Sequence, residues 1–296
     1  MESSLYWDRM NQMPAGRAFE AYHLTDTTPQ PKIIHSHEHY EIYFFLSGHT
    51  RLIIEDVDIY PCRGDVVVIP PHCIHRNIHL DADEPYERFY LYATREFLQT
   101  VTDGSYSLAA ETDALLTAFG YHFRLNDTAL EELIRLTDEL ILCAQLTTPA
   151  EQMLNRCRMG MLLIRIMLLL RAGSASVQDM GQGRMNELIR YLNEHVTQGV
   201  TLEELAEKYY VSKFALLREF RAHTGMTIHQ YILAKRVLLA QELIRRGMKP
   251  NQVSDECGFA DYTSFYRAFR RRMGISPSQY GKRQENGQKE NHPSHG

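Results

Sequence analysis

The chain has 296 residues, 44% of them apolar, and a formal net charge of −5, which predicts about two globular domains with ordinary hydrophobic cores. Its five cysteines form no C-x-x-C pair, its first residues show no signal-peptide pattern, and its longest apolar run, 159–170, contains Arg165 and is too short to span a bilayer. These features argue against a secreted disulfide scaffold and against a membrane protein, and they predict a cytoplasmic chain without a membrane partner.

Residues 18–100 are predicted to form short β-strands. Gly and Pro separate four runs that are rich in β-branched and aromatic residues: 42–46, 51–54, 66–69 and 89–92. Short strands divided in this way are typical of an antiparallel sandwich or a small barrel. We therefore expect a β domain over residues 1–110.

Two groups of polar residues and turns stand at fixed spacings within the predicted β domain. They are His35, His37, Glu41 and Gly48, and then Gly64, Pro70 and His75. Both spacings, H-x-H-x₃-E-x₆-G and G-x₅-P-x₄-H, resemble the two motifs of the cupin family. The resemblance implies a small cupin-like barrel in which His35, His37, Glu41 and His75 either bind a divalent transition metal or line a pocket for a small effector. We favour the pocket, for a neutral or anionic metabolite such as a sugar, and assign no metal or other cofactor.

From residue 111 to residue 171 the pattern becomes helical. The tetrapeptide Thr148-Pro149-Ala150-Glu151 combines an N-cap, an N1 proline and a capping-box glutamate. The helix that it begins, ending near residue 171, carries more Met, Leu and Ile than one buried face needs. It is therefore either a helix enclosed in the core or part of a dimer seam, and the sequence supports both interpretations equally. On the second interpretation, 111–171 is a dimerisation segment and the protein is a homodimer.

Two segments have no periodic apolar pattern. Residues 172–184 are small and polar and are predicted to be a linker, and 284–296 are predicted to be a disordered tail. The charge changes sign across the linker: residues 1–184 hold 15 Lys+Arg and 25 Asp+Glu, whereas 185–284 hold 16 and 10. The differences, −10 and +6, assign contact with a polyanion to the second half.

Residues 202–280 contain one helical pattern twice. The residues Leu216, Arg218, Phe220, Gly225 and Tyr231 have counterparts 49 positions later in Phe265, Arg267, Phe269, Gly274 and Tyr280. N-cap residues and glycine stops predict two helix-turn-helix units, about 201–223 and 250–272, joined by a long helix over about 228–246. Two such units in one chain are typical of a protein that reads successive turns of DNA.

The outward face of the second helix of each unit carries residues that can contact DNA. Arginine can donate two hydrogen bonds to a guanine edge, Ser and Thr can bond to either base type or to a phosphate, and additional arginines suit phosphate neutralisation. The predicted contacts are Lys213, Phe214, Leu217, Arg218 and Arg221 in the first unit, and Tyr262, Thr263, Ser264, Arg267, Arg270 and Arg271 in the second. We interpret them as a DNA-binding surface, because the repeat, the glycine stops and the local positive charge coincide.

The stretch 258–280, G-F-A-D-Y-T-S-F-Y-R-A-F-R-R-R-M-G-I-S-P-S-Q-Y, is similar to the signature of the AraC/XylS family of bacterial transcription regulators. The similarity is close over 185–283, although Gly281 replaces a usual arginine and Ser254 a usual alanine. It implies that a rigid long helix holds two helix-turn-helix units, whose second helices enter successive major grooves on one face of the DNA.

Taken together, the sequence predicts an α+β multidomain protein. Its parts are a cupin-like effector-binding β-barrel (1–110), a helical segment (111–171), a linker (172–184), an all-α domain of two helix-turn-helix units (185–283) and a tail (284–296). We expect a ligand-responsive, sequence-specific transcription regulator and no enzyme, with double-stranded DNA, a small-molecule effector and RNA polymerase as partners. The alternative is a metal-dependent cupin enzyme, a dioxygenase or isomerase, with an accessory DNA-binding domain.

Overall fold

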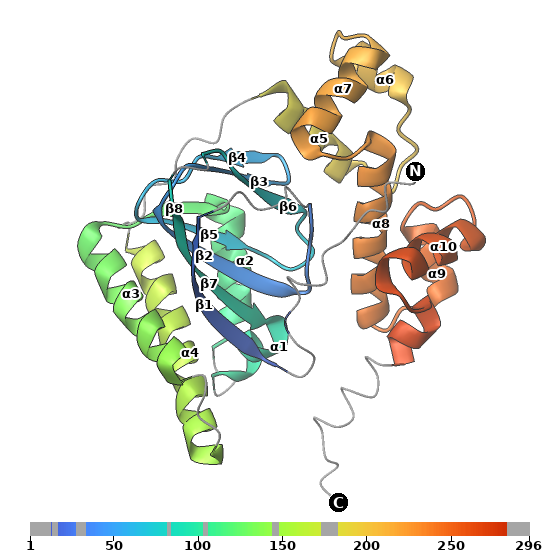
Figure 1. Ribbon diagram of the computed structural model, residues 1–296. Coiled ribbons are helices and arrows are strands. Elements are labelled where there is room, and N and C mark those ends of the chain that lie inside the picture. Colours follow the sequence, from blue (N-terminus) through green and yellow to red (C-terminus); the bar gives the residue numbers. More distant parts are fainter. Residues whose placement is uncertain are drawn as a thin grey trace, which may run out of the picture. The chain divides into compact units, whose positions relative to one another are not determined.

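The computed structural model describes residues 13, 17–27, 34–81, 84–102, 106–143, 148–172 and 183–282. The chain divides into two compact units, Met1–Gly181 and Gln182–Gly296, whose elements are labelled in Figure 1. The division falls within the predicted linker, of which 173–182 lie outside the described residues, as does the predicted tail. None of the described helices is both long and apolar enough to cross a membrane.

The first unit contains two antiparallel sheets (Figure 1). Their strands are β1 (Phe19–Asp26), β2 (His39–Ser47), β3 (Thr50–Ile54), β4 (Val57–Ile59), β5 (Asp65–Ile69), β6 (His75–His79), β7 (Tyr86–Thr94) and β8 (His122–Arg124). The larger sheet has the order β1-β7-β2-β5-β8 and the smaller one the order β4-β3-β6. The closed barrel that the cupin spacing predicts is not found among the described residues, because the short strands β3, β4 and β6 form ladders only with one another.

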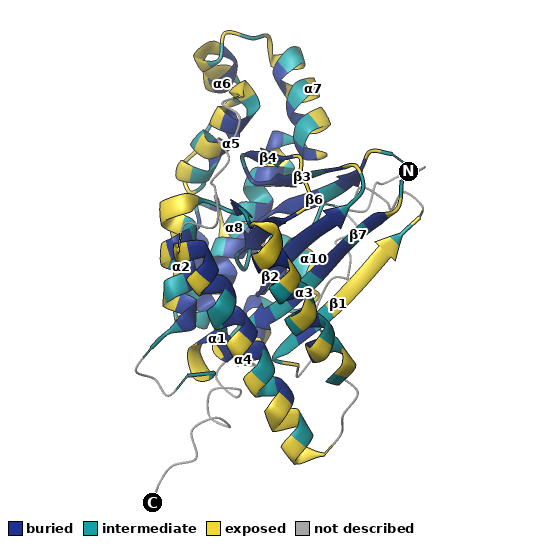
Figure 2. Cartoon of the chain, turned by 90° about the vertical axis from the view of Figure 1, so that its left-hand side faces the viewer, coloured by how far each residue is buried: buried dark blue, intermediate teal, exposed yellow. Residues whose placement is uncertain are grey.

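The inner strands of the larger sheet are covered on both faces, as β7 illustrates, whereas the edge strand β1 is largely exposed (Figure 2). Successive side chains of a strand point to opposite faces, so Phe89 and Leu91 face one way while Tyr86 and Tyr90 face the other. Phe89 and Leu91 belong to a core that the sheet shares with the helices of this unit. Tyr86 and Tyr90 belong to the second core, which also contains residues of the smaller sheet such as Ile54.

Helices cover one face of the larger sheet (Figure 1). They are α1 (Arg95–Thr100), α2 (Leu108–Phe119), α3 (Asp127–Leu142) and α4 (Pro149–Arg171). The predicted capping box of Thr148 and Glu151 is confirmed at the start of α4. The predicted helical segment 111–171 contains α2, α3 and α4, but it also includes the strand β8, which pairs with β5, and α2 begins slightly earlier, at Leu108. A strand of three residues is too short to show a period of two.

The second unit is all helical. It consists of α5 (Arg184–Glu194), α6 (Leu202–Lys208), α7 (Lys213–Thr224), α8 (Ile228–Arg245), α9 (Pro250–Glu256) and α10 (Tyr262–Met273), followed by a helical turn at 277–282. Figure 1 shows α8 joining the α6–α7 pair to the α9–α10 pair. The predicted stops are confirmed, because Gly225 and Gly274 end α7 and α10 in the left-handed conformation, with φ of 76° and 72°.

The 49-residue repeat extends to the packing of the side chains. Phe220 and Phe269 are fully buried. Each meets a tyrosine edge to face: the ring centroids of Phe220 and Tyr231 are 5.6 Å apart, and so are those of Phe269 and Tyr280. Each pair anchors the second helix of its unit to the helix that follows it. The two units are therefore built alike around α7 and α10.

Candidate functional site

The outward faces of α7 and α10 are open to solvent. All of the residues predicted to contact DNA are exposed, and Phe214 is 88% exposed although it is apolar. Lys213 forms an ion pair with Glu203 of α6, which partly neutralises its charge.

The start of α10 contains a residue that the sequence reasoning missed. Asp261 is its N-cap: Oδ1 accepts a hydrogen bond from the Ser264 backbone at 2.7 Å, and Oδ2 accepts one from the Ser264 hydroxyl at 2.9 Å. The backbone hydrogen bond from Ser264 also lowers the pKa of Asp261. Because the hydroxyl proton is directed to Asp261, Ser264 can offer only lone pairs to a base. It is therefore suited to accept from the amino group of adenine or cytosine.

The two helices end in positive charge. The last turn of α10 contains Arg270, Arg271 and Arg272, and the last turn of α7 contains Arg221. Cations at a helix C-terminus also interact favourably with the helix dipole. A helix that enters a groove by its N-terminal turns needs polar side chains there to reach the base edges. It needs basic side chains near its C-terminal end, where it crosses the phosphates.

In the first unit of the chain, the four residues predicted to form a pocket or metal site are brought together. Donor atoms of His35, His37, Glu41 and His75 all lie within 4.8 Å of one another. A short antiparallel bridge joins the backbones of His35 and His75. Glu41 Oε2 is 3.0 Å from His37 Nε2 and 3.6 Å from His75 Nε2.

The hydrogen bonds behind the histidines fix which nitrogen faces Glu41. His37 Nδ1 lies 2.8 Å from the His39 carbonyl, and His75 Nδ1 lies 3.0 Å from the Cys73 carbonyl. A carbonyl only accepts, so both Nδ1 atoms donate. Each Nε2 therefore faces Glu41 with a lone pair when the ring is neutral, and donates to the carboxylate when the ring is protonated. Burial lowers the pKa of His37 and thus disfavours a proton on its Nε2. A divalent transition metal fits these facing acceptors, and the backbone carbonyls act as its outer partners.

A row of tyrosines lies beside this histidine–glutamate site and was missed by the sequence reasoning. The ring centroids of Tyr92 and His39 are 4.6 Å apart, and Tyr90 contacts both Tyr92 and Tyr43. Burial raises the pKa values of all three tyrosines, so they remain neutral phenols. Neutral phenols beside imidazoles add ring faces and hydroxyl groups to the surroundings of the site. Alternation of Tyr on 86–92 was the available clue.

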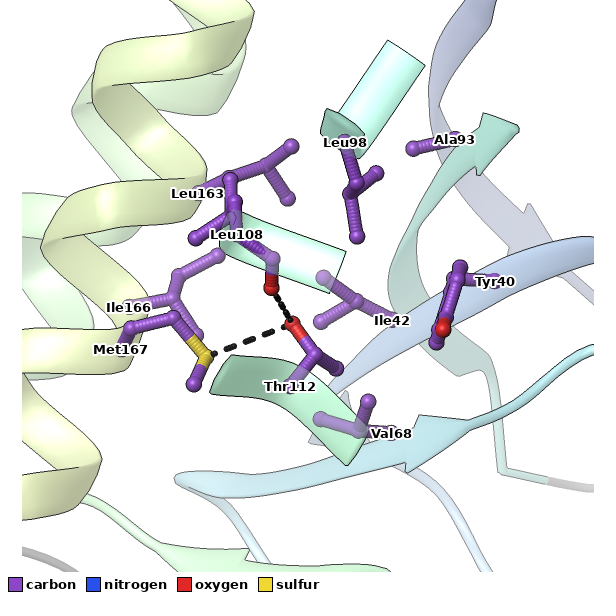
Figure 3. Close-up of a pocket in the computed structure, with 10 residues that line it drawn as sticks. All are labelled: Tyr40, Ile42, Val68, Ala93, Leu98, Leu108, Thr112, Leu163, Ile166 and Met167. Atoms are coloured by element: carbon purple, nitrogen blue, oxygen red, sulfur yellow. Dashed lines mark hydrogen bonds between the residues drawn. The ribbon is translucent and has the colours of Figure 1, made fainter. Parts of the chain in front are cut away.

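A cavity on the other face of the larger sheet is too small to be an effector pocket. It lies between the sheet and α1, α2 and α4, and its lining is almost entirely apolar (Figure 3). Its single polar side chain besides Tyr40 is Thr112, which donates to the Leu108 carbonyl at 2.8 Å. The volume is about 10 Å³, which is the space of one water molecule at most. It is a packing gap in the core.

Comparisons with known proteins agree with both parts of this arrangement. A helix-turn-helix domain model matches residues 205–283, and an AraC-like ligand binding domain model matches 18–163. The probable transcriptional regulator LumQ of Photobacterium leiognathi is 26% identical over 86% of this chain and 94% of its own length. The HTH-type transcriptional activator RhaS of Citrobacter koseri is 26% identical over 82% of this chain and 85% of its own length.

The structure of ToxT from Vibrio cholerae is 12% identical to this chain, covers 90% of it and 98% of ToxT, and gives a TM-score of 0.34. A likeness this low carries no weight in the assignment. The two domain models do, because the ligand-binding match covers the β unit with its histidine–glutamate site and the helix-turn-helix match covers α7 and α10. The chain therefore belongs to the AraC family of ligand-responsive, DNA-binding transcription regulators.

Proposed function

We propose that this regulator reads its DNA site with both α7 and α10, and that α10 makes most of the hydrogen bonds to bases. The observation that carries the proposal is the contrast between the two faces of each helix. Leu216 and Phe265 are fully buried, whereas every residue of the predicted DNA-contacting set is exposed. On α10 the exposed set includes Ser264 and Arg267, while α7 presents Phe214 and Leu217, which suit the methyl group of thymine.

Replacing Arg267 with alanine should weaken binding to the cognate site selectively. The loss of a bidentate contact to guanine is expected to cost about 1–3 kcal/mol on that site and far less on random DNA. Fluorescence anisotropy at one fixed salt concentration measures both, with a cognate duplex selected from random DNA by the wild-type protein. Arg271→Ala is the matched control, and it should weaken both duplexes alike because a phosphate contact carries no sequence information. Equal losses for Arg267→Ala would show that it contacts only phosphate.

The outside of α4 supports the predicted homodimer (Figure 2). Leu154, Cys157, Met161, Ile164 and Leu168 alternate at spacings of three and four residues and are exposed or half-buried. This is the spacing of a coiled-coil seam. Leu154 and Leu168 are each seven residues from Met161. A two-fold axis through Met161 and perpendicular to α4 therefore pairs the two α4 helices antiparallel, with Leu154 of one copy against Leu168 of the other. We infer that a second copy of this chain covers the stripe.

Replacing Met161 with glutamate should therefore dissociate the dimer. Two like charges would meet at the axis, and the dissociation constant is expected to rise more than about tenfold. Sedimentation velocity over a range of protein concentrations measures the change. Phe119→Glu, which adds the same charge at an exposed apolar residue of α2, should leave the dimer intact. A dimer that survives Met161→Glu would place the interface elsewhere.

We also propose that the histidine–glutamate site, with the neighbouring tyrosines, binds the effector. Effector binding there would favour one arrangement of the two compact units, Met1–Gly181 and Gln182–Gly296, and so change the affinity for DNA. DNA would in turn change the affinity for the effector by the same factor. A divalent metal is a second candidate occupant, favoured by the lone pairs that His37 and His75 direct at Glu41. The enzyme alternative would need turnover as well as metal, and the named relatives are transcription regulators. RNA polymerase and a cytoplasmic location stay predictions.

A further inference from the structure

The segment after α5 makes a contact with the second helix-turn-helix unit that α8 alone would not provide. We propose that Arg236 and Gly258 are positioning residues, which hold residues 196–198 between α8 and the α9–α10 unit and thereby fix the spacing of half-elements that the protein accepts on DNA. The inference rests on the proposed function, in which α7 and α10 both read DNA.

Arg236 of α8 holds the segment from one side. Its Nε donates to the Val196 carbonyl at 2.7 Å, and its Nη2 donates to the Gln198 carbonyl at 2.8 Å. A planar guanidinium that grips two carbonyls fixes the orientation of the segment as well as its position. The guanidinium carbon also lies 6.0 Å from the centroid of the Phe259 ring, which belongs to the turn of the second unit.

Gly258 in that turn approaches the residue between the two gripped carbonyls. A Cβ added to Gly258 would lie 2.1 Å from the Thr197 oxygen and 2.6 Å from its carbonyl carbon. Atoms at these distances overlap, and the neighbour is backbone, which cannot turn aside as a side chain can. The glycine therefore allows the second helix-turn-helix unit to pack directly against residues 196–198, which Arg236 holds.

The first helix-turn-helix unit contains the same turn, but residues 196–198 do not dock on it. Backbone N–H groups of 209, 210 and 211 donate to the carbonyls of 205, 207 and 206, and those of 257, 258 and 259 donate to 253, 255 and 254, which is the same pattern 48 residues on. Tyr210 occupies the place of Gly258 with a φ of 53° and is 95% exposed. The turn itself thus accommodates a side chain, so it is the docking on Thr197 that requires glycine at 258.

Residues 196–198 follow α5, which is itself hydrogen-bonded to α8 and to the first helix-turn-helix unit. The Tyr231 hydroxyl donates to Asn193 Oδ1 at 3.0 Å, and the Tyr209 hydroxyl donates to the Glu187 carbonyl at 3.2 Å. The two helix-turn-helix units are therefore joined twice, once by α8 and once by 196–198. One base pair of extra spacing moves a half-element by about 3.4 Å and turns it by about 34°. Two units joined at two places cannot follow this change, whereas units joined by α8 alone could bend and twist.

The test measures affinity on duplexes that carry the two half-elements of the wild-type protein's selected site at the native spacing and at spacings one or two base pairs longer or shorter. Wild-type protein is expected to lose about tenfold or more for each wrong spacing, since one helix can no longer bind at the same time as the other. Arg236→Met should weaken binding at the native spacing and reduce the preference to about threefold or less, because a flexible pair still reaches both half-elements. Arg236→Lys should be intermediate, since its single ammonium cannot grip both carbonyls at once.

Gly258→Ala should behave as Arg236→Met does, and Tyr210→Ala should keep the wild-type spacing preference. Circular dichroism melts check that each variant retains its helices. The proposal fails if Arg236→Met and Arg236→Lys fold and keep the wild-type spacing preference. It also fails if both of these variants are unfolded, because the contact then only stabilises the fold. Wild-type protein that shows no spacing preference would instead overturn the reading of DNA by both helices.

Discussion

Replacing Asp65 with alanine should destabilise the first unit by roughly 3–5 kcal/mol. Asp65 is fully buried, and its two oxygens accept hydrogen bonds from Arg124 at 2.6 and 2.8 Å, with His122 Nε2 at 3.0 Å. These contacts hold β8 to the end of β5. Removing the carboxylate leaves His122 and Arg124 without their common partner. His122 is buried, whereas Arg124 can be hydrated in part because its side chain is 32% exposed. Urea unfolding at neutral pH measures the loss.

Asp58→Ala is the control for the Asp65 experiment, and pH provides a second check. The Arg51–Asp58 pair has the same bidentate geometry but is partly exposed, so its loss should cost less than about 1 kcal/mol. Burial opposes ionisation of Asp65, but hydrogen bonds from His122 and Arg124 outweigh it and lower its pKa. Its contribution is therefore complete above the ordinary aspartate pKa of about 3.9 and is lost as the pH falls through the lower folded-state value. A wild-type advantage that persisted at still lower pH would contradict this origin.

If a divalent metal occupies the histidine–glutamate site, replacing Glu41 with glutamine should abolish its tight binding. The expected loss of affinity for Zn²⁺ or Mn²⁺ exceeds about 100-fold, because substitution of partners one shell farther out already costs 10- to 100-fold. Glutamine retains the size of the side chain but not the negative charge that balances the cation. Calorimetric titration with each metal, and metal content after dialysis, measure the change.

The chain offers a matched control for Glu41→Gln in a second group of donors. His49, Asp81 and Glu84 also lie close enough together to share an ion, but they are exposed or half-buried, and His49 already pairs with Glu84 at 2.8 Å. Glu84→Gln should therefore leave the metal content unchanged. Wild-type protein that takes up neither metal would show that the histidine–glutamate site is a metal-free pocket, and the folded state of Glu41→Gln can be confirmed by its melting curve.

The helical half of the molecule could be predicted closely from the sequence because its helix ends depend on local chemistry. The capping box of Thr201 and Glu204 at the start of α6, and Gly274 at the end of α10, each depend on residues within one turn of the helix. The β half depends on contacts between distant residues. No local pattern shows that Arg124 pairs with Asp65, 59 positions earlier, and so β8 was missed.

The histidine–glutamate site lies between these two cases. The resemblance to the cupin motifs implies that His35, His37 and Glu41 share a site, and the structure brings them together with His75. The direction of each lone pair depends on carbonyl groups such as that of Cys73, whose position follows from the fold. Asp261 was likewise missed as a partner of Ser264, because the direction of the Ser264 hydroxyl proton depends on the folded turn at the start of α10.

The difference between Tyr210 and Gly258 limits how this regulator can be re-engineered. Two similar units invite the exchange of one for the other, as a way to build a protein with new target preferences. A whole first unit transplanted into the second place would bring a tyrosine side chain against the Thr197 backbone, where even a Cβ overlaps. The exposed faces of α7 and α10 carry no such restriction. Specificity can therefore be exchanged face by face, while the turn of the second helix-turn-helix unit must keep its glycine.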